Sequence, residues 1–265
     1  MMPRPPASIN LRVDGLTGTI ADKHLVKRIT WAGEGGELWG VLGANGAGKS
    51  TFLGLLSGTP RTGLLRTGTI SCAGSPLEAL PARERARLLA YLPQHPETPP
   101  TLTVAETVLL GRSPYRSAFA GPAPEDTEAL ERALERMDLG GLRDRLPTTL
   151  SGGERQRMHF ARILAQDARI WLLDEPYGHL DFAHQARLLD LLVELAVERG
   201  LLIVLVAHDL FFLPRAATHL AVLHEGELLA AGPTATVWTE ALAERAFGVP
   251  FVREGAMLFP RWRAG

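Results

Sequence analysis

The stretch Gly43-Ala44-Asn45-Gly46-Ala47-Gly48-Lys49-Ser50-Thr51 is the most informative part of the chain. It has the spacing G-x-x-x-x-G-K-S of a phosphate-binding loop. The apolar run Leu38 to Leu42 before it suits a buried strand, and Thr51 to Leu56 after it can continue as a helix. Glycines let backbone N–H groups converge on phosphate oxygens, and the positive end of the helix dipole lies at the same point. The order strand, loop, helix therefore predicts a site for the phosphates of a nucleotide.

Two side chains of this loop have distinct predicted roles. Lys49 can reach the β- and γ-phosphates, and the Ser50 hydroxyl can ligate Mg²⁺. The alternative is a glycine-rich turn with an accidental Lys-Ser, which the flanking strand and helix disfavour. The predicted phosphate-binding residues are Gly43, Asn45, Gly46, Ala47, Gly48, Lys49, Ser50 and Thr51.

Composition limits the class of protein. The chain has 265 residues, 46% hydrophobic and 22% charged, which suits one large globular domain or one domain with a subdomain. A formal net charge of −1 provides no general attraction to nucleic acid. The single cysteine, Cys72, excludes an internal disulfide and is interpreted as a packing residue. No apolar run approaches the roughly 18 residues of a membrane helix, and residues 1–8 lack a signal-like apolar core, so we expect a flexible N-terminus.

Apolar patterns predict alternating strands and helices. Strands are expected at 9–13, 26–31, 38–42, 67–72, 89–93, 170–173 and 201–207. Helices are expected at 81–89, 101–110, 125–137, 153–166, 183–199 and 241–247. A turn region is expected at 17–24 and a hairpin at 219–230 that turns at Glu225-Gly226. This order predicts an α/β fold with a parallel sheet covered on both faces and a helical insertion near residues 101–149.

Two carboxylates and a histidine follow buried strands. Asp174 and Glu175 follow the strand at 170–173, and His208 follows the one at 201–207. Because the carboxyl ends of parallel strands meet at one edge of a sheet, these side chains are expected to converge on the ligand. Asp174 can hold Mg²⁺, and Glu175 can orient or deprotonate an attacking water. His208 can hydrogen-bond the γ-phosphate, although a lone histidine after a strand is more often structural.

Gln94 completes this predicted group. It follows the short strand at 89–93, and its neutral side chain can touch both Mg²⁺ and the attacking water. Alone it would carry no information. With the phosphate loop it gives a predicted catalytic set of Glu175, His208 and Gln94 and a predicted metal set of Ser50, Gln94 and Asp174.

The segment Leu150-Ser151-Gly152-Gly153-Glu154-Arg155-Gln156 predicts a second phosphate-binding corner, because a Ser-Gly-Gly turn opens a helix there. One γ-phosphate does not need two such corners from one chain. We therefore expect Ser151, Gly152 and Gly153 to bind a nucleotide held by another subunit. The alternative is an ordinary serine helix cap.

Together these motifs resemble those of the ATP-binding-cassette (ABC) ATPases, from about residue 9 to 249. The resemblance implies a Walker A loop at 43–51, a Q-loop at Gln94, a signature at 150–156, a Walker B strand ending at Asp174-Glu175, a D-loop at 178–181 and a switch histidine at His208. Asp181 joins the predicted nucleotide-binding residues on this ground.

The resemblance also implies the architecture. It is a P-loop NTPase (RecA-like) core with an antiparallel β-subdomain, a helical subdomain inserted at about 100–150 and a short C-terminal tail at 250–265. Two copies would close head to tail and sandwich two ATP with Mg²⁺. Hydrolysis would open them, and the motion would drive a partner.

One departure from the family concerns adenine. The family usually stacks an aromatic side chain on the base just after the first strand, and that place falls near Ile20 or Asp22. Neither residue is aromatic. Apolar contact with Ile20 or Val26 is the expected replacement, or else weaker base selectivity.

Within the family, the segments 104–115, 180–185, 230–233 and 247–249 are similar to those of ATPases that serve iron-siderophore, haem and cobalamin uptake. The resemblance implies an importer ATPase, peripheral on the cytoplasmic face of the cell membrane. Its partners would be a second copy of itself, permease subunits and, indirectly, a substrate-binding protein, with no nucleic acid. Residues 111–117 are expected to face the permease.

Two alternatives remain open. One is a soluble ABC ATPase acting in iron–sulfur assembly, DNA repair or translation. Three features argue against the last two: only one cassette is present, the net charge is close to zero, and only about 100 residues separate Lys49 from Ser151. The other is a non-enzymatic nucleotide-binding module, which the presence of Glu175 and His208 disfavours.

The phosphate-loop assignment is testable. We expect Lys49→Ala to weaken nucleotide binding, because the ammonium contact with the β- and γ-phosphates is lost. Calorimetric titration with ATP measures the change, and an unaltered affinity would remove the assignment.

Overall fold

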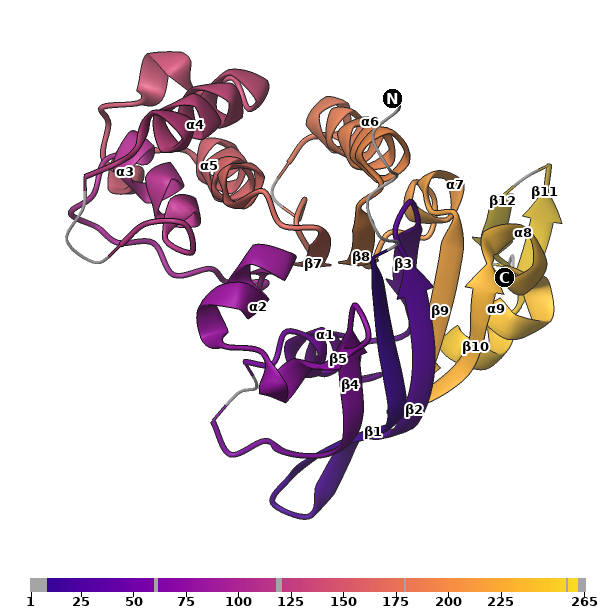
Figure 1. Cartoon of the computed structure of the whole chain (residues 1–265). Helices are drawn as coiled ribbons and strands as arrows, with labels where there is room; N and C mark the ends of the chain where they lie inside the picture. The colour runs from indigo at the N-terminus through magenta and orange to yellow at the C-terminus, as the bar shows by residue number, and fades with distance from the viewer. Residues whose placement is uncertain (1–8, 60–61, 118–120, 179, 256, 262–265) are drawn as a thin grey trace, which may run out of the picture.

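The computed structural model describes residues 9–59, 62–117, 121–178, 180–255 and 257–261, and Figure 1 shows their arrangement. The residues expected as a flexible N-terminus, 1–8, lie outside these ranges. The main sheet has six strands in the order β10-β9-β3-β8-β7-β6. All neighbours in it are parallel except β9 and β10, which form the predicted hairpin. Its strands are β3 (Leu38–Leu42), β6 (Leu89–Leu92), β7 (Ile170–Asp174), β8 (Leu202–Val206), β9 (His219–His224) and β10 (Glu227–Pro233).

Both faces of this sheet are covered, which explains why its central strands are apolar throughout. In β8, Leu202, Val204 and Val206 belong to the core shared with the antiparallel sheet. Ile203 and Leu205 belong to the core under the helices on the other face. The predicted α/β fold class with a parallel sheet is confirmed.

A second sheet is antiparallel, in the order β2-β1-β4-β5. It contains β1 (Asn10–Ile20), β2 (Lys23–Glu34), β4 (Leu65–Cys72) and β5 (Ser75–Pro76). The predicted turn region at 17–24 is wrong, because β1 and β2 continue through it and leave only Ala21 and Asp22 as the turn. Both residues have positive φ, 42° and 66°, which residues other than glycine seldom adopt. Because neither is glycine, the sequence carried no signal for a turn at this point.

The helices are largely those predicted from the sequence. They are α1 (Lys49–Leu56), α2 (Ala82–Leu88), α3 (Val104–Leu109), α4 (Pro124–Arg136), α5 (Gly152–Gln166), α6 (Phe182–Arg199), α7 (Leu213–Ala216), α8 (Thr234–Val237) and α9 (Glu240–Phe247). The helix expected at 101–110 starts only at Val104, because Thr103 caps it in a capping box with Glu106. Within the described ranges, no helix combines the length and hydropathy that crossing a bilayer requires.

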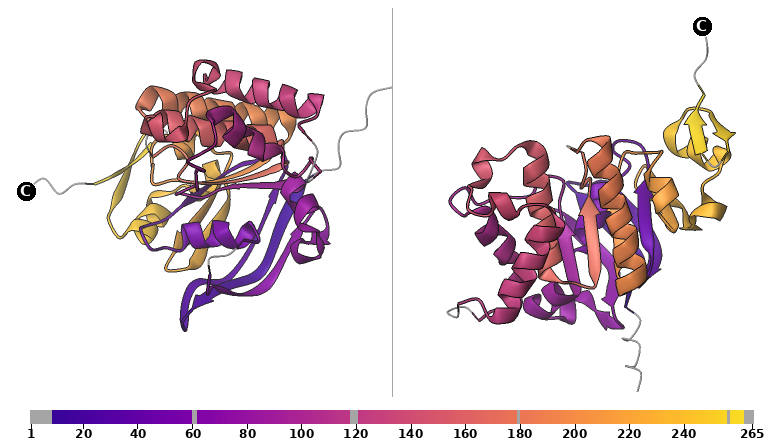
Figure 2. Two further views of the ribbon diagram at one scale, coloured as in Figure 1. Left: turned by 90° about the vertical axis from the view of Figure 1, so that its left-hand side faces the viewer. Right: turned by 90° about the horizontal axis from the view of Figure 1, so that it is seen from above.

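The two ends of the molecule are built from different elements. Helices α3, α4 and α5 gather at one end, and α9 with the hairpin of β11 (Phe251–Glu254) and β12 (Met257–Pro260) lies at the other (Figures 1 and 2). The segment expected as a tail thus contains a hairpin, and Phe251 and Leu258 anchor it in the core.

A buried ion pair holds the segment after α3. Arg112 is 8% exposed, and its Nε donates to Asp126 Oδ1 at 2.9 Å. Its Nη1 donates to the Ala165 carbonyl, and its guanidinium lies 4.0 Å from the centroid of the Tyr115 ring. Within the segment 111–117 that is expected to face a permease, the Arg112 side chain is therefore enclosed and cannot present its charge to a partner.

Arg112→Ala would leave the Asp126 carboxylate buried without its cation. We expect the free energy of unfolding in urea to fall by about 3–5 kcal/mol. Arg132→Ala is the matched control, since the pair of Arg132 with Glu128 is exposed on both sides and should contribute less than about 1 kcal/mol. Equal losses in the two variants would contradict this account of the ion pair.

Candidate functional site

The glycine-rich loop joins β3 to α1, and two of its glycines are required by close backbone contacts. Gly43 has φ 149°, and a Cβ there would lie 2.2 Å from the Leu223 carbonyl oxygen. Gly48, at the N-cap of α1, has φ 97°, and a Cβ there would lie 2.4 Å from the Leu25 carbonyl oxygen. No side chain fits at either position. The loop can therefore turn tightly enough to aim its N–H groups at one point.

Lys49 folds back over this loop. Its Nζ donates to the carbonyls of Gly43 at 2.7 Å and Ala44 at 3.0 Å. Burial lowers the pKa of Lys49, and the charges of Glu175 and Asp174 oppose that shift. The loop thus encloses a positive charge, which suits an anionic ligand.

Asp174 meets the loop from β7. Its Oδ1 accepts a hydrogen bond from Ser50 Oγ at 3.0 Å, and the residue is 2% exposed. Burial raises the pKa of Asp174, while the hydrogen bond from Ser50 opposes the rise. A hydroxyl and a carboxylate oxygen side by side fit Mg²⁺, a hard cation that prefers oxygen ligands.

The three predicted catalytic residues converge. Gln94 Nε2 donates to Glu175 Oε2 at 2.9 Å, and His208 Nε2 lies 2.5 Å from Glu175 Oε1. Glu175 has φ 50°, a conformation that costs free energy in a non-glycine residue. Its N–H donates to the Val206 carbonyl at 2.9 Å, which ties the strained residue to β8. The carboxylate is thereby held in one place by neighbouring strands.

One cavity of about 800 Å³ unites the loop with this group. It is lined by residues 45–51, Gln94, Glu175 and His208, as the sequence predicted, and also by Lys23, His24, Leu25, Lys27, Glu225 and Gly226. The second set was missed. Its members lie at the start of β2 and in the β9–β10 turn, which reach the loop only through tertiary structure.

The expected adenine contacts need correction. Val26 is fully buried, and neither it nor Ile20 lines the cavity. His24 and Leu25 do. The His24 ring is held by a 2.9 Å hydrogen bond between its Nδ1 and Thr19 Oγ1, across the turn that sequence reasoning misplaced. The signal in the sequence that could have identified His24 is its imidazole, a flat ring four residues beyond Ile20 that can stack on a base.

Ser151, Gly152, Gly153 and Asp181 lie outside this cavity. Ser151 caps α5: its Oγ accepts from the Glu154 N–H, and its own N–H donates to Glu154 Oε2 at 2.7 Å. Asp181 caps α6, and the backbone hydrogen bond from His184 lowers the pKa of Asp181. The structure thus shows both residues as helix N-caps, and a contact of either with a nucleotide remains a proposal. His179, within the implied D-loop, is outside the described residues.

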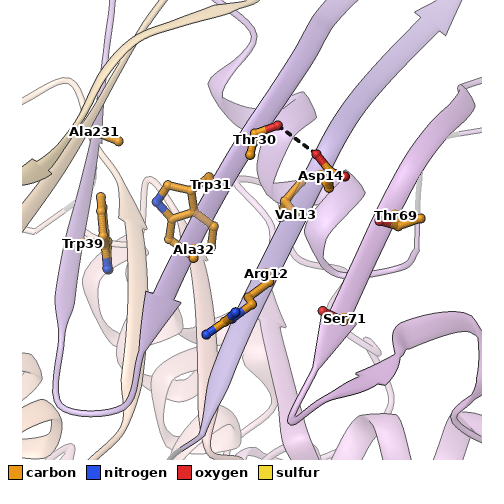
Figure 3. Close-up of a pocket in the computed structure, with 10 residues that line it drawn as sticks. All are labelled: Arg12, Val13, Asp14, Thr30, Trp31, Ala32, Trp39, Thr69, Ser71 and Ala231. Carbon is orange, nitrogen blue, oxygen red and sulfur yellow. Dashed lines mark hydrogen bonds between the residues drawn. The ribbon is translucent and has the colours of Figure 1, made fainter.

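A different hollow, about 480 Å³, lies on the antiparallel sheet (Figure 3). Arg12 and Asp14 line it from β1, and Thr30 Oγ1 donates to Asp14 Oδ1 at 3.2 Å. None of the predicted phosphate-binding or catalytic residues borders it. It is therefore separate from the candidate nucleotide site.

Comparison with known proteins agrees with the geometry. Residues 26–178, more than half of the chain, match the family described as ABC transporter. This chain belongs to the ABC transporter ATP-binding family. As a member of that family it binds ATP, and it is an ATPase coupled to transport.

Similar proteins and structures narrow the comparison. This ABC ATPase is 41% identical over 214 residues to a probable siderophore transport system ATP-binding protein of Bacillus subtilis (strain 168), covering 81% of the chain and 77% of that protein. It is 37% identical over 239 residues to the ferric enterobactin transport ATP-binding protein of Escherichia coli (strain K12), covering 90% and 87%.

Two solved structures are also similar. One, an ABC transporter described as of metal-chelate type in an inward-facing conformation, has a TM-score of 0.79 at 27% identity and covers 96% of this chain and 98% of its own. The other, a dimeric bacterial ABC transporter cassette, has a TM-score of 0.73 at 26% identity and covers 84% and 98%.

We expect His24→Ala to raise the dissociation constant for ATP by about tenfold, because stacking of a base on an aromatic ring contributes about 1–3 kcal/mol. His24→Phe, which keeps a flat ring, should bind ATP nearly as well as the unmodified chain. Fluorescence titration with a labelled ATP analogue measures both. Unchanged affinity in His24→Ala would show that the base lies elsewhere.

Proposed function

We propose that this ABC ATPase is the ATP-hydrolysing subunit of an importer that takes up an iron chelate such as a siderophore, haem or cobalamin. The observation that carries its enzymatic part is the convergence of Gln94, Glu175 and His208 beside the Lys49 loop. The class of cargo is supported by the names of relatives that serve siderophore, ferric enterobactin and hemin transport, at 36–41% identity.

Hydrolysis would use groups that already contact one another. The loop N–H groups and Lys49 bind the phosphates, and Glu175 accepts the proton of the attacking water. His208 and Gln94 hold the two oxygens of that carboxylate. Ser50 and Asp174, with Gln94, would hold Mg²⁺, which supplies positive charge to the phosphates when bound.

We further propose that each ATP lies between two copies of the chain. Ser151 and the phosphate loop do not share a cavity within one copy, yet each lies at the N-terminus of a helix, an end that attracts anions. A dimeric cassette among the similar structures supports this arrangement. The importer would also contain permease subunits, with this subunit peripheral on the cytoplasmic face of the membrane and a binding protein delivering the cargo.

Glu175→Gln keeps the hydrogen bonding of the side chain but removes the base. We expect ATP hydrolysis to fall by about 10²-fold or more, while the dissociation constant for ATP stays within about twofold. The variant should also accumulate as an ATP-bound dimer in sedimentation velocity experiments. Glu198→Gln, exposed at the far end of α6, is the control and should hydrolyse ATP normally. Normal turnover in Glu175→Gln would refute the role given to Glu175.

The cargo assignment needs its own test. We expect the tagged chain to co-purify with a permease from the membranes of its source cells. Those cells should lose uptake of a radiolabelled iron chelate or haem when the chromosomal copy carries Glu175→Gln. Loss of ATPase activity with unaltered uptake of siderophore, haem and cobalamin would exclude the proposed cargo.

A further inference from the structure

Aromatic side chains form an exposed patch next to the catalytic pair. Phe182, the first residue of α6, is 75% exposed, more than any other large hydrophobic side chain that the structure describes. Phe211, three residues after His208, is 42% exposed. The Phe182 ring lies 6.0 Å from that of Phe212, and the Phe211 ring lies 5.5 Å from that of Phe259 in β12. We call these four residues the aromatic patch.

A hollow of about 290 Å³ connects the patch with the site. Phe182, Phe211 and Phe212 line it together with Glu175 and His208. Tyr177 lines it too: this residue is 5% exposed, and its hydroxyl has no hydrogen-bond partner in the structure. The hollow therefore offers an incoming group aromatic surface next to Glu175 and His208. Solvent-exposed aromatic surface of this kind is typical of a contact site.

The topology shows which edge of the molecule carries the patch. The phosphate loop, Glu175 and His208 all follow the carboxyl ends of parallel strands. α5 leads into β7 and α6 leads out of it, and a helix that connects parallel strands runs antiparallel to them. The N-terminal ends of both helices, with Ser151 and Phe182, therefore lie at the same carboxyl edge.

The strand order also locates the patch along this edge. The phosphate loop follows β3, whereas α5 and its cap Ser151 belong to the helical end, where α5 packs against β6. β8 and β7 lie between β3 and β6 in the sheet. Phe211 follows β8 and Phe182 follows β7, so both lie between the two phosphate-binding corners.

This position has a consequence for a symmetric pair. If the phosphate loop of each copy faces Ser151 of the other, the two-fold axis passes midway between the loop and Ser151 of one copy. Residues close to such an axis meet the same residues of the second copy. The ends of β7 and β8 occupy that midpoint, and with them Phe182 and Phe211.

We propose that the aromatic patch forms a direct contact between two copies of this chain at their two-fold axis, in which Phe182 and Phe211 are covered by the second copy. The contact rests on the proposed function, because the paired ATP sites define the axis. Covering two exposed rings removes apolar surface from water, and aromatic pairs add about 0.5–1.5 kcal/mol each. Because the hollow is shared with Glu175 and His208, closure of the pair also removes water from one side of the catalytic carboxylate.

The single native cysteine makes a direct test practicable. Cys72 is buried, and burial raises the pKa of its thiol to about 11, so it reacts poorly with maleimides. We expect Phe182→Cys in the Glu175→Gln background to give a covalent dimer with a short bismaleimide when ATP is present. Val197→Cys is the control: it is 66% exposed on the same helix but about 22 Å further along, and should remain monomeric.

A second pair of variants measures the energy of the contact. In the Glu175→Gln background, Phe182→Glu and Phe211→Glu should each raise the dissociation constant of the ATP-bound dimer by about tenfold or more, because two like charges meet at the axis. Val197→Glu should leave it unchanged. Circular dichroism verifies that each variant is folded, and ATP titration verifies that each still binds nucleotide.

The outcomes separate this contact from the proposed function. Two results would overturn the contact while leaving the ATP-dependent pair intact. In one, the ATP-bound dimer forms but the thiol of Phe182→Cys gives no cross-link and still reacts fully with maleimide. In the other, both glutamate variants keep the dimer dissociation constant unchanged. The patch would then be free for another partner, such as the permease. If Glu175→Gln itself binds ATP yet never dimerises, the paired ATP sites are refuted, and the contact falls with them.

Discussion

The close approach of the phosphate loop to two neighbouring strands is the constraint on which the site depends. Gly43 and Gly48 lie so near the carbonyls of Leu223 and Leu25 that neither position has room for a Cβ. Hydrogen bonds from the Gly226 N–H to the Ala47 carbonyl and from the Lys27 N–H to the Gly226 carbonyl continue this contact. The loop is therefore clamped between the parallel and the antiparallel sheet. Its rigidity lets backbone N–H groups act as a preorganised anion site.

Charge at the site is arranged by burial. Lys49 and Asp174 are both almost completely enclosed. Burial lowers the pKa of Lys49 and raises the pKa of Asp174, so in each case it favours the neutral form. Such groups are stable only with close partners, which the loop carbonyls and Ser50 provide. Glu175, in contrast, is positioned by Gln94 and His208, each of which contacts one of its two carboxylate oxygens.

The same sheet edge connects chemistry with assembly. Because parallel strands end together, the Glu175 carboxylate, the helix caps and the aromatic patch all lie at the edge where the proposed second copy would approach. Gln156 adds a link within one copy, since its amide donates to the Pro176 carbonyl just after Glu175. The signature helix α5 and the catalytic strand β7 are thus joined directly. Movement of the helical end would be transmitted to the segment that carries Glu175, the proposed base.

Local patterns in the sequence were sufficient for most of the elements and for the chemical identity of the site. The periodicity of α4, α5 and α6 and the apolar runs of β7 and β8 predicted these elements within a few residues, because spacing along the chain determines which face is apolar. The loop motif likewise predicted a phosphate site, and the polar residues after the strands predicted side chains that the structure brings together around Glu175.

The rest required the tertiary structure. The turn at Ala21-Asp22 bears no glycine, and His24, which follows it, lines the cavity against expectation. The burial of Arg112 depends on Asp126, a residue of α4 that no local pattern joins to it. The neighbours of a side chain depend on how distant segments pack, and residues far apart in the chain leave no local signal of that contact. By itself the sequence determined most of the elements and which residue types follow the strands; packing decided which side chains share a cavity and which are buried.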